Sequence, residues 1–264
     1  MNRPTQQDTD SSLIRGLKLL NLFSLREAEL SIGEMARRSG TPKSTTHRLV
    51  QDLIQWGALE RGRKGVRLGV RLFELGNMVP DHTRLRELAI PFAHTLNTIT
   101  KLTSNIAVRE GSEIIYIEKI RSEDLRVPHS RVGGRLPMHC TALGKTILAF
   151  STDEFVESVL SEPLARLADK TITEPERLRA ELSEVRRTRV AYDLEESQEG
   201  LFCVAAPIIG YANRALGAIS VTGASSRSQA RSFSDAVSAS AHAITHALRR
   251  PSGRSRRMAS SRAR

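Results

Sequence analysis

The sequence predicts an α+β protein in which a small, basic, mostly helical domain precedes a larger domain of strands and helices. Residues 13–69 show helical apolar spacing that ends in a short glycine-flanked hairpin. Beyond residue 100 the pattern changes to the alternation of apolar and polar residues that is typical of half-buried strands. At 264 residues, the chain is long enough for each part to bury its own core.

The net charge of +11 is unevenly distributed along the chain. Residues 1–80 hold 13 basic and 8 acidic side chains, residues 81–248 hold 20 and 21, and residues 249–264 hold 7 arginines and no acid. A neutral middle between two basic ends indicates a polyanionic partner for the ends. We expect residues 1–12 and the tail 250–264 to be disordered, the tail being either a solvated terminus or an additional phosphate contact.

The composition argues against membrane, secreted and metal-binding proteins. No run approaches the ~18 apolar residues of a membrane-spanning helix, and the polar N-terminus lacks the apolar core of a signal peptide. Cys140 and Cys203 lie far apart, without zinc-binding spacing. His129, His139 and Cys203 provide no close pair of ligands. We therefore expect a cytoplasmic protein without a metal or a cofactor.

Residues 31–54 have the pattern of two short helices joined by a tight turn. Ser31 and Glu34 have the spacing of a capping box. Gly40 suits the left-handed end of the first helix, Thr41 is the expected N-cap of the second, and Pro42 suits its first turn. This is the layout of a helix-turn-helix, whose second helix lies in the major groove of DNA. An ordinary pair of packed helices has the same spacing, so the sequence around the motif has to decide.

The second helix of this motif turns small polar and basic side chains outward, because its apolar residues recur at helical spacing and are expected to be buried. Thr45 and Arg48 have the alternative of facing neighbouring helices or a phosphate. The predicted DNA contacts in this helix are Lys43, Ser44, Thr45, Thr46, His47 and Arg48.

A basic hairpin follows the motif. Residues 58–61 and 66–68 are expected to be short strands on either side of a glycine-flanked turn. Loops of this composition are often only solvated turns, but the order of helix, helix, turn, helix and basic hairpin is that of a winged helix. We predict a winged helix-turn-helix DNA-binding domain over residues 13–69, with four side chains of the wing reaching phosphates or the minor groove: Arg61, Arg63, Lys64 and Arg67.

The rest of the chain alternates between helices and hairpins. Residues 70–84 are expected to form a connecting helix, and Pro91 is expected to kink the next helix or to begin a new one. Residues 133–137 are expected to be a loop, and Thr173 is expected to open a capping box. The predicted strands are 104–109, 113–120, 201–209 and 215–222, and the predicted later helices are 142–150, 155–160, 173–187 and 234–248. Strands in hairpins with helices outside them indicate an α+β sensor-like domain.

Four stretches together resemble the IclR family of bacterial transcriptional regulators, over roughly residues 12–249. They are SGTPKSTTHRLVQDLIQWGALER, VRLGVRLFELG, GGRLPMHCTALGKTILA, and the pair VAYDLEESQEGLFCVAAPI and ALGAISVTG. The resemblance implies a winged helix joined by a linker helix, residues 70–84, to a GAF-like effector-binding domain, residues 85–249. It also implies homodimers or dimers of dimers that bind operator DNA, sense a small organic or aromatic acid, and repress or activate catabolic operons.

The resemblance also implies an effector pocket in the second domain. Leu143 stands where smaller residues are common in the family and is expected to narrow the pocket, and Thr222 stands where a serine is common. The expected pocket residues are Leu136, Met138, His139, Ala142, Leu143, Asp193, Leu201, Cys203, Ser220 and Thr222.

The chemistry of these positions favours binding. Ser220 and Thr222 are two residues apart on a strand, so their hydroxyls share one face and suit a carboxylate. The alternative is that neighbouring backbone groups satisfy both hydroxyls. Asp193 suits either a ligand hydroxyl or a structural cap or salt bridge, and Cys203 suits core filling.

An enzyme is the rival interpretation. His139 and Cys140 are adjacent on an expected extended segment and point to opposite faces, which disfavours a Cys–His pair. A dyad of His139 with Asp193 stays open from the sequence. We predict no catalytic residues, and we keep as the alternative a small-molecule-binding enzyme or sensor with an incidental basic N-terminal domain.

Overall fold

The computed structural model describes residues 10–24, 26–122 and 130–250. The chain divides into two compact units, Met1–Pro80 and Asp81–Arg264, which are described separately. The expectations for residues 1–9, for His129 and for the tail 251–264 concern parts that lie outside the described residues.

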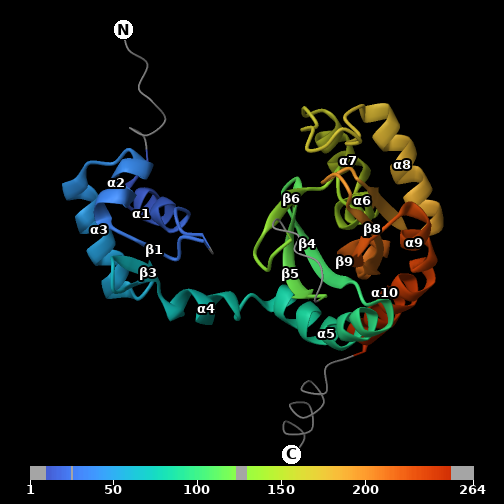
Figure 1. Ribbon diagram of the computed structural model, residues 1–264, viewed down its shortest axis with the longest axis horizontal. Coiled ribbons are helices and arrows are strands. Elements are labelled where there is room, and N and C mark those ends of the chain that lie inside the picture. The colour runs from blue at the N-terminus through green and yellow to red at the C-terminus, as the bar shows by residue number, and fades with distance from the viewer. Residues whose placement is uncertain (1–9, 25, 123–129, 251–264) are drawn as a thin grey trace, which may run out of the picture. The chain divides into compact units, whose positions relative to one another are not determined.

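The N-terminal unit combines helices with a small antiparallel sheet (Figure 1). Its elements are α1 (Ser12–Leu20), β1 (Glu29–Leu30), α2 (Ile32–Ser39), α3 (Lys43–Trp56), β2 (Leu59–Arg61), β3 (Val66–Leu68) and α4 (Val70–Gly76). The sheet has the order β1-β3-β2, so the predicted hairpin of β2 and β3 gains a third strand that the sequence pattern did not indicate. The core is formed by Leu19, Leu30, Met35, Leu49, Val50, Leu59 and Val66.

The turn between α2 and α3 differs in detail from the prediction. Ser31 Oγ accepts a hydrogen bond from the amide of Glu34 at 3.1 Å, and Gly40 is left-handed with φ of 66°. The carboxylate of Glu34, however, pairs with two arginines of its own helix, so only half of the capping box forms. The N-cap of α3 is Pro42 and not Thr41, and this cap has no side-chain hydrogen bond.

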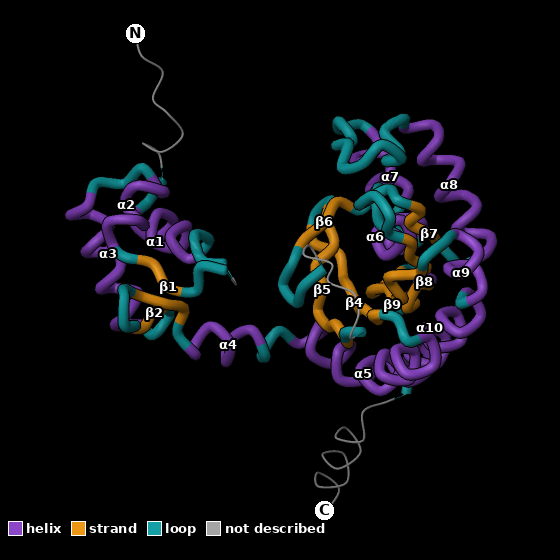
Figure 2. Tube along the Cα trace, in the orientation of Figure 1, coloured by secondary structure: helices purple, strands orange, loops and turns teal. Residues whose placement is uncertain are grey.

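The C-terminal unit is built on one six-stranded antiparallel sheet with the order β6-β5-β4-β9-β8-β7 (Figure 2). The strands are β4 (Thr103–Glu110), β5 (Glu113–Ile120), β6 (Arg135–Pro137), β7 (Ala191–Leu194), β8 (Phe202–Ile209) and β9 (Ala215–Ala224). The predicted loop at residues 133–137 is wrong at β6, because Leu136 pairs with Ile114 of β5. Strand β7 was not predicted either.

Helices cover both faces of this sheet. They are α5 (Pro80–Thr100), α6 (Ala142–Ala149), α7 (Asp153–Leu160), α8 (Pro175–Thr188), α9 (Arg227–Ser232) and α10 (Ser234–Arg249), with a short 3-10 turn η1 (Tyr211–Asn213). Apolar residues of α5 and α10 pack on the face that carries Ile106 and Ile219. Residues of α6, α7 and α8 pack on the opposite face, with Ala107 and Ala218. Figure 1 shows α5 and α10 on one side of the sheet and α6 on the other.

The structure decides between the two alternatives for Pro91 and corrects the predicted start of α8. Pro91 lies inside α5 and does not begin a new helix, and Thr95 Oγ1 donates to the carbonyl of Pro91 at 3.0 Å. Helix α8 begins at Pro175 with Glu174 as its N-cap, so Thr173 is one residue too early to cap it. The predicted connector, residues 70–84, covers α4, the break after it and the first residues of α5.

A candidate DNA interface and a candidate effector cavity

The N-terminal end of α3 presents a polar surface. Lys43, Ser44, His47 and Arg48 are exposed, and Thr45 is half-buried. Thr46 is fully buried, and its hydroxyl donates to the carbonyls of Thr41 and Pro42 at 3.3 and 3.1 Å. The prediction of Thr46 as a DNA contact is therefore wrong, because its side chain satisfies the turn that precedes the helix.

The wing is held in shape by an acid from β1. Glu29 Oε1 accepts hydrogen bonds from the backbone amides of Lys64 at 2.6 Å and Gly65 at 3.0 Å. A Cβ at Gly62 would lie 2.0 Å from Glu29 Oε1, and a Cβ at Gly65 would lie 2.1 Å from the carbonyl oxygen of Leu30. Gly65 is therefore required by the close approach of the β1 backbone, whereas a side chain at Gly62 would displace the Glu29 carboxylate from the wing.

The cations of the wing are exposed but not equivalent. Arg63 and Lys64 sit at the tip of the turn. Arg61 donates to Gln51 Oε1 at 3.2 Å, and Arg67 forms a salt bridge with Glu60 on the neighbouring strand. An ion pair already satisfies part of the charge of Arg67, so Arg63 and Lys64 are the better candidates for phosphate contacts.

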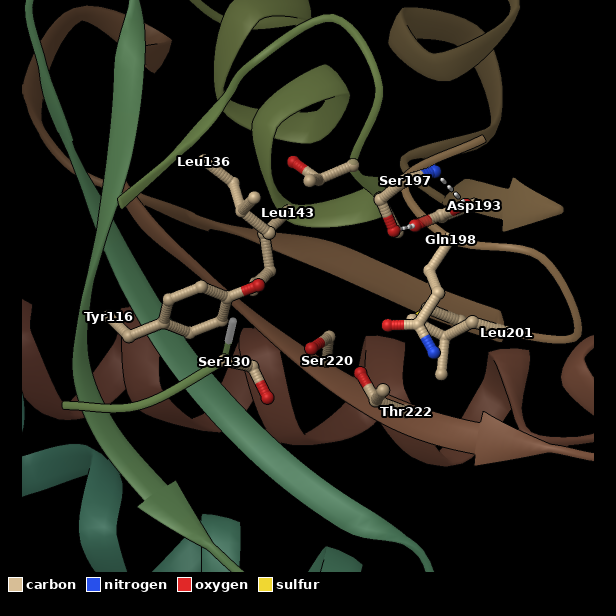
Figure 3. A pocket seen from close by; sticks show the side chains of 13 residues that line it. Tyr116, Ser130, Leu136, Leu143, Asp193, Ser197, Gln198, Leu201, Ser220 and Thr222 are labelled. Atoms are coloured by element: carbon tan, nitrogen blue, oxygen red, sulfur yellow. Dashed lines mark hydrogen bonds between the residues drawn. The ribbon is translucent and has the colours of Figure 1, made fainter. Parts of the chain in front are cut away.

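The C-terminal unit holds a small cavity between the sheet and α6, lined by both apolar and polar side chains (Figure 3). Its volume is about 20 Å³, which is room for about one water molecule. It is lined by Tyr116, Ser130, Leu136, Thr141, Ala142, Leu143, Asp193, Ser197, Gln198, Leu201, Cys203, Ser220 and Thr222. The sheet register explains part of this set, because Thr222 of β9 pairs with Cys203 of β8, which pairs with Asp193 of β7.

Most of the predicted pocket residues meet at this cavity, namely Leu136, Ala142, Leu143, Asp193, Leu201, Cys203, Ser220 and Thr222. Met138 and His139 are buried but do not line it, so these two predictions are corrected. His139 Nε2 lies 2.9 Å from the carbonyl oxygen of Ala165, and burial lowers the pKa of His139. The hydrogen bonds of His139 and Asp193 go to separate partners, which argues against a dyad.

Asp193 is the acidic group of the cavity. It is 1% exposed, and its carboxylate accepts hydrogen bonds from the amides of Glu196 at 2.8 Å and Ser197 at 3.2 Å and from the hydroxyl of Ser197. Burial raises the pKa of Asp193 to about 6, although the hydrogen bond from Ser197 opposes this effect. Figure 3 shows Ser197 bonded to Asp193 at the rim of the cavity.

A buried ion pair ties this rim to α6. Lys145 is fully buried, and its ammonium lies 2.6 Å from Glu196 Oε1 and 3.1 Å from Glu181 Oε1. Burial is the main cause that raises the pKa of Glu196, and Lys145 opposes it. Because the amide of Glu196 also binds Asp193, the Lys145 ion pair and the cavity carboxylate share one loop.

The residues missed by the sequence interpretation are polar groups of the cavity: Tyr116, Ser130, Thr141, Ser197 and Gln198. Burial strongly raises the pKa of Tyr116, so its phenol stays protonated, and Figure 3 shows its oxygen pointing toward the middle of the cavity. The alternation on β5 placed Tyr116 on the same face as Ile114 and was the one available signal. Ser197 and Gln198 lie in a loop, where no periodicity indicates direction.

The chain matches two family descriptions. Residues 12–63 match "IclR helix-turn-helix domain", and residues 78–246 match "Bacterial transcriptional regulator IclR C-terminal". The chain belongs to the IclR family. Its members are DNA-binding transcriptional regulators and not enzymes, which answers the rival interpretation. The predicted α+β class with a winged helix and an effector domain is confirmed.

Individual relatives cover nearly the whole chain. The transcriptional regulator XynR of Escherichia coli is 30% identical over 246 residues, which are 91% of this chain and 98% of the relative. The transcriptional repressor IclR of E. coli is 32% identical over 221 residues, which are 82% and 81% of the two chains. The solved structure of an IclR homolog from Microbacterium hydrocarbonoxydans, complexed with 4-hydroxybenzoate, superposes with a TM-score of 0.84 at 30% identity and covers 90% of this chain and 99% of that one.

This IclR-family chain shows neither a spanning helix nor a metal cluster in its described part. None of the helices described combines the length and apolar character that crossing a bilayer needs. Among the residues described, no group of three or more potential metal ligands comes together, and Cys140 and Cys203 are buried free thiols.

Proposed function

We propose that this IclR-family regulator binds an operator as a homodimer or a dimer of dimers, and that a small organic or aromatic acid in the cavity changes its DNA affinity. We assign DNA binding to residues 13–69, the connection to residues 70–84 and effector binding to residues 85–249. The observation that carries the proposal is a chain with two separate sites, an exposed basic helix and wing on one unit and a small cavity with apolar and polar lining in the other.

Several features support an acid as the effector. Hydroxyls of Ser220, Thr222 and Thr141 line the cavity, and the first amides of α6, at Ala142 and Leu143, have no carbonyl one turn earlier in the helix to accept them. A helix N-terminus favours negative charge. The relative from M. hydrocarbonoxydans was solved with 4-hydroxybenzoate, an aromatic acid.

Exposed apolar side chains support self-association of the N-terminal unit. On and after α4, Val70 is 65% exposed, Phe73 72% and Met78 65%, and on α1 Leu13 is 70% exposed. Leu13 and Leu72 also line one groove with apolar residues of α1 and α3, and exposed apolar patches mark interaction sites on soluble proteins. A second copy of the chain is the occupant that a palindromic operator requires, since the symmetry of a dimer matches that of the DNA. Phe73→Glu should lower the mass measured by light scattering.

The direct test is a gel shift with the DNA upstream of the chain's own gene, with and without candidate acids. We expect specific binding that changes when an acid is added, as repression or activation of a catabolic operon in the cytoplasm requires. By linkage, an acid that weakens DNA binding must itself bind more weakly to the DNA complex. Equal acid affinity with and without operator contradicts the coupling, and no specific shift contradicts DNA recognition.

A further inference from the structure

Asn105 of β4 is a buried polar residue behind the cavity wall. It is 1% exposed and pairs directly with Ser220 of β9, so both side chains lie on the same face of the sheet. Its Nδ2 donates to Thr222 Oγ1 at 3.1 Å and reaches Ser220 Oγ at 3.5 Å. Ser220 and Thr222 line the cavity, whereas Asn105 is not part of the lining. In this structure Asn105 therefore meets the cavity through these two hydroxyls.

The amide of Asn105 is oriented with its nitrogen toward the hydroxyls. In this orientation Oδ1 is the one Asn105 atom that lacks a hydrogen-bond partner within the described part of the chain. The reversed amide would instead leave two N–H donors unpaired. Buried unpaired N–H groups are rarer in proteins than buried unpaired oxygens, so the observed orientation has the lower cost.

The orientation of the Asn105 amide determines whether the hydroxyls of Ser220 and Thr222 can donate a hydrogen bond to a ligand. A hydroxyl that accepts from an amide keeps its own hydrogen for donation. Among the residues described, neither hydroxyl donates to a carbonyl or carboxylate oxygen, and the hydrogen bond from Thr222 that lowers the pKa of Cys203 goes to sulfur, a weak acceptor. We propose, on the basis of the effector-binding role proposed above, that Asn105 is a specificity-determining residue that makes this end of the cavity a pair of donors for a carboxylate.

The charges around the cavity also favour a carboxylate at the end formed by Ser220 and Thr222. Lys119 of β5 pairs with Asn105 on the other side of β4, and its ammonium contacts Ser130 Oγ at 2.6 Å, a group of the cavity lining. Asp193 lies two strands from Thr222, across β8. An acid would therefore place its carboxylate at the Ser220–Thr222 end, with any hydroxyl group of the ligand toward Asp193.

The test compares acids with their neutral amides. The probes are acetate, pyruvate, benzoate and 4-hydroxybenzoate, each paired with its amide and measured by calorimetry and thermal shift at pH 7. This pH lies above the pKa of Asp193, about 6, and below that of Lys119, which burial lowers to about 8. Wild type should prefer at least one acid, and Asn105→Asp should reduce the acid-to-amide affinity ratio by about tenfold or more, because it replaces the donor by an acceptor. Ser104→Ala is the matched control, since the Ser104 hydroxyl is also buried but donates to Ala93 on the other face of β4.

A double-mutant cycle separates specificity from folding. Asn105→Ala should lose acid affinity in the wild-type background and lose less of it in a Thr222→Val background, because the shorter of the two hydrogen bonds of Asn105, at 3.1 Å, goes to Thr222. Asn105→Ala also carries the comparison if Asn105→Asp does not fold. Equal effects of Asn105→Ala in both backgrounds, an unchanged ratio in the Asn105 variants, or no preference for any acid in wild type overturns the inference. Absence of specific operator binding by wild type, both with and without the acids, would instead contradict the proposed function.

Discussion

Asp193→Asn isolates the free energy that burial of one carboxylate costs the C-terminal unit. Asn is nearly isosteric, its Oδ1 can still accept from the amides of Glu196 and Ser197, and its NH2 can donate to the Ser197 hydroxyl that Asp193 now accepts from. The exchange therefore keeps the local hydrogen bonds and removes the charge.

The magnitude follows from the pKa of Asp193. Its folded-state pKa is about 6 against an ordinary value of 3.8, so between these values the folded chain binds a proton that the unfolded chain has released. The unfolding free energy of wild type therefore falls as pH rises from about 4 to about 6. The pKa difference corresponds to about 3 kcal/mol. Relative to wild type, Asp193→Asn should become more stable by roughly this amount as pH rises from 4 to 7.

Urea unfolding followed by far-ultraviolet circular dichroism across this pH range measures the difference. Trp56 is the single tryptophan and lies in α3, so its fluorescence reports the N-terminal unit and serves as an internal control. Asp235→Asn, at an exposed position of α10, controls for the lost negative charge. A stability difference between Asp193→Asn and wild type that stays constant from pH 4 to 7 would refute the burial argument.

Three predictions concern the N-terminal unit. Replacing Arg63 and Lys64 by alanine should weaken binding to all DNA sequences and reduce the slope of log affinity against log salt by about 2, measured by fluorescence anisotropy. Glu29→Ala removes the acceptor of two wing amides and should lower operator affinity several-fold while leaving the salt slope unchanged, because the cations remain. Thr46→Val should lower stability by about 1 kcal/mol without changing sequence preference in a binding-site selection.

Each of these changes has a control on the same molecule. Arg227→Ala removes an exposed cation from the other unit and should leave the salt slope unchanged. Glu27→Ala breaks an exposed ion pair with Arg38, away from the wing amides, and should spare operator affinity. Ser44→Ala, at an exposed position of α3, should change operator affinity and leave stability unchanged. An unaltered salt slope in the double variant, or equal losses from Glu29→Ala and Glu27→Ala, contradicts the account of the wing.

The sequence predicted the helices and strands whose residues follow a local pattern. Helical spacing placed α3, and alternation is seen in β5, because burial of one face determines these periods. Strands β4, β8 and β9 are buried along most of their length, since helices cover both faces of the sheet. Three-residue β6 and four-residue β7 are too short to show a period. Thr46 was misassigned for a related reason, since its hydroxyl is used by backbone carbonyls of the preceding turn and not by its own face of the helix.

The cavity was predicted only in part, because its walls come from segments far apart in the chain. The resemblance supplied positions on β6, α6, β7, β8 and β9, but five further residues complete the lining: Tyr116, Ser130, Thr141, Ser197 and Gln198. Asn105 could not be singled out from sequence, since its importance arises from pairing with Ser220 across 115 residues. Contacts of this kind depend on strand order, which periodicity does not determine.

The size of the cavity links effector binding to a movement of its wall. An aromatic acid is much larger than the single water molecule that about 20 Å³ accommodates. Helix α6 is buried along its whole length, and β8 and β9 are interior strands, so the elements packed around them hold these walls in place. The loop 195–200 is different: Glu199 and Gly200 are exposed, and Glu195 has a positive φ of 67°.

Opening this loop disturbs specific contacts. The bond of Ser197 to Asp193 holds the loop against β7, and the ion pair of Glu196 with Lys145 holds it against α6. A buried charge that loses its partner is costly. An effector must therefore form new hydrogen bonds in place of those that it breaks. The difference in free energy between the contacts made in the open and in the closed conformation limits how far the effector shifts the equilibrium between them. A larger acid that engages Asp193 with a hydroxyl replaces more of these bonds than a simple carboxylate, so hydroxy acids should be stronger effectors than acids of the same size without a hydroxyl.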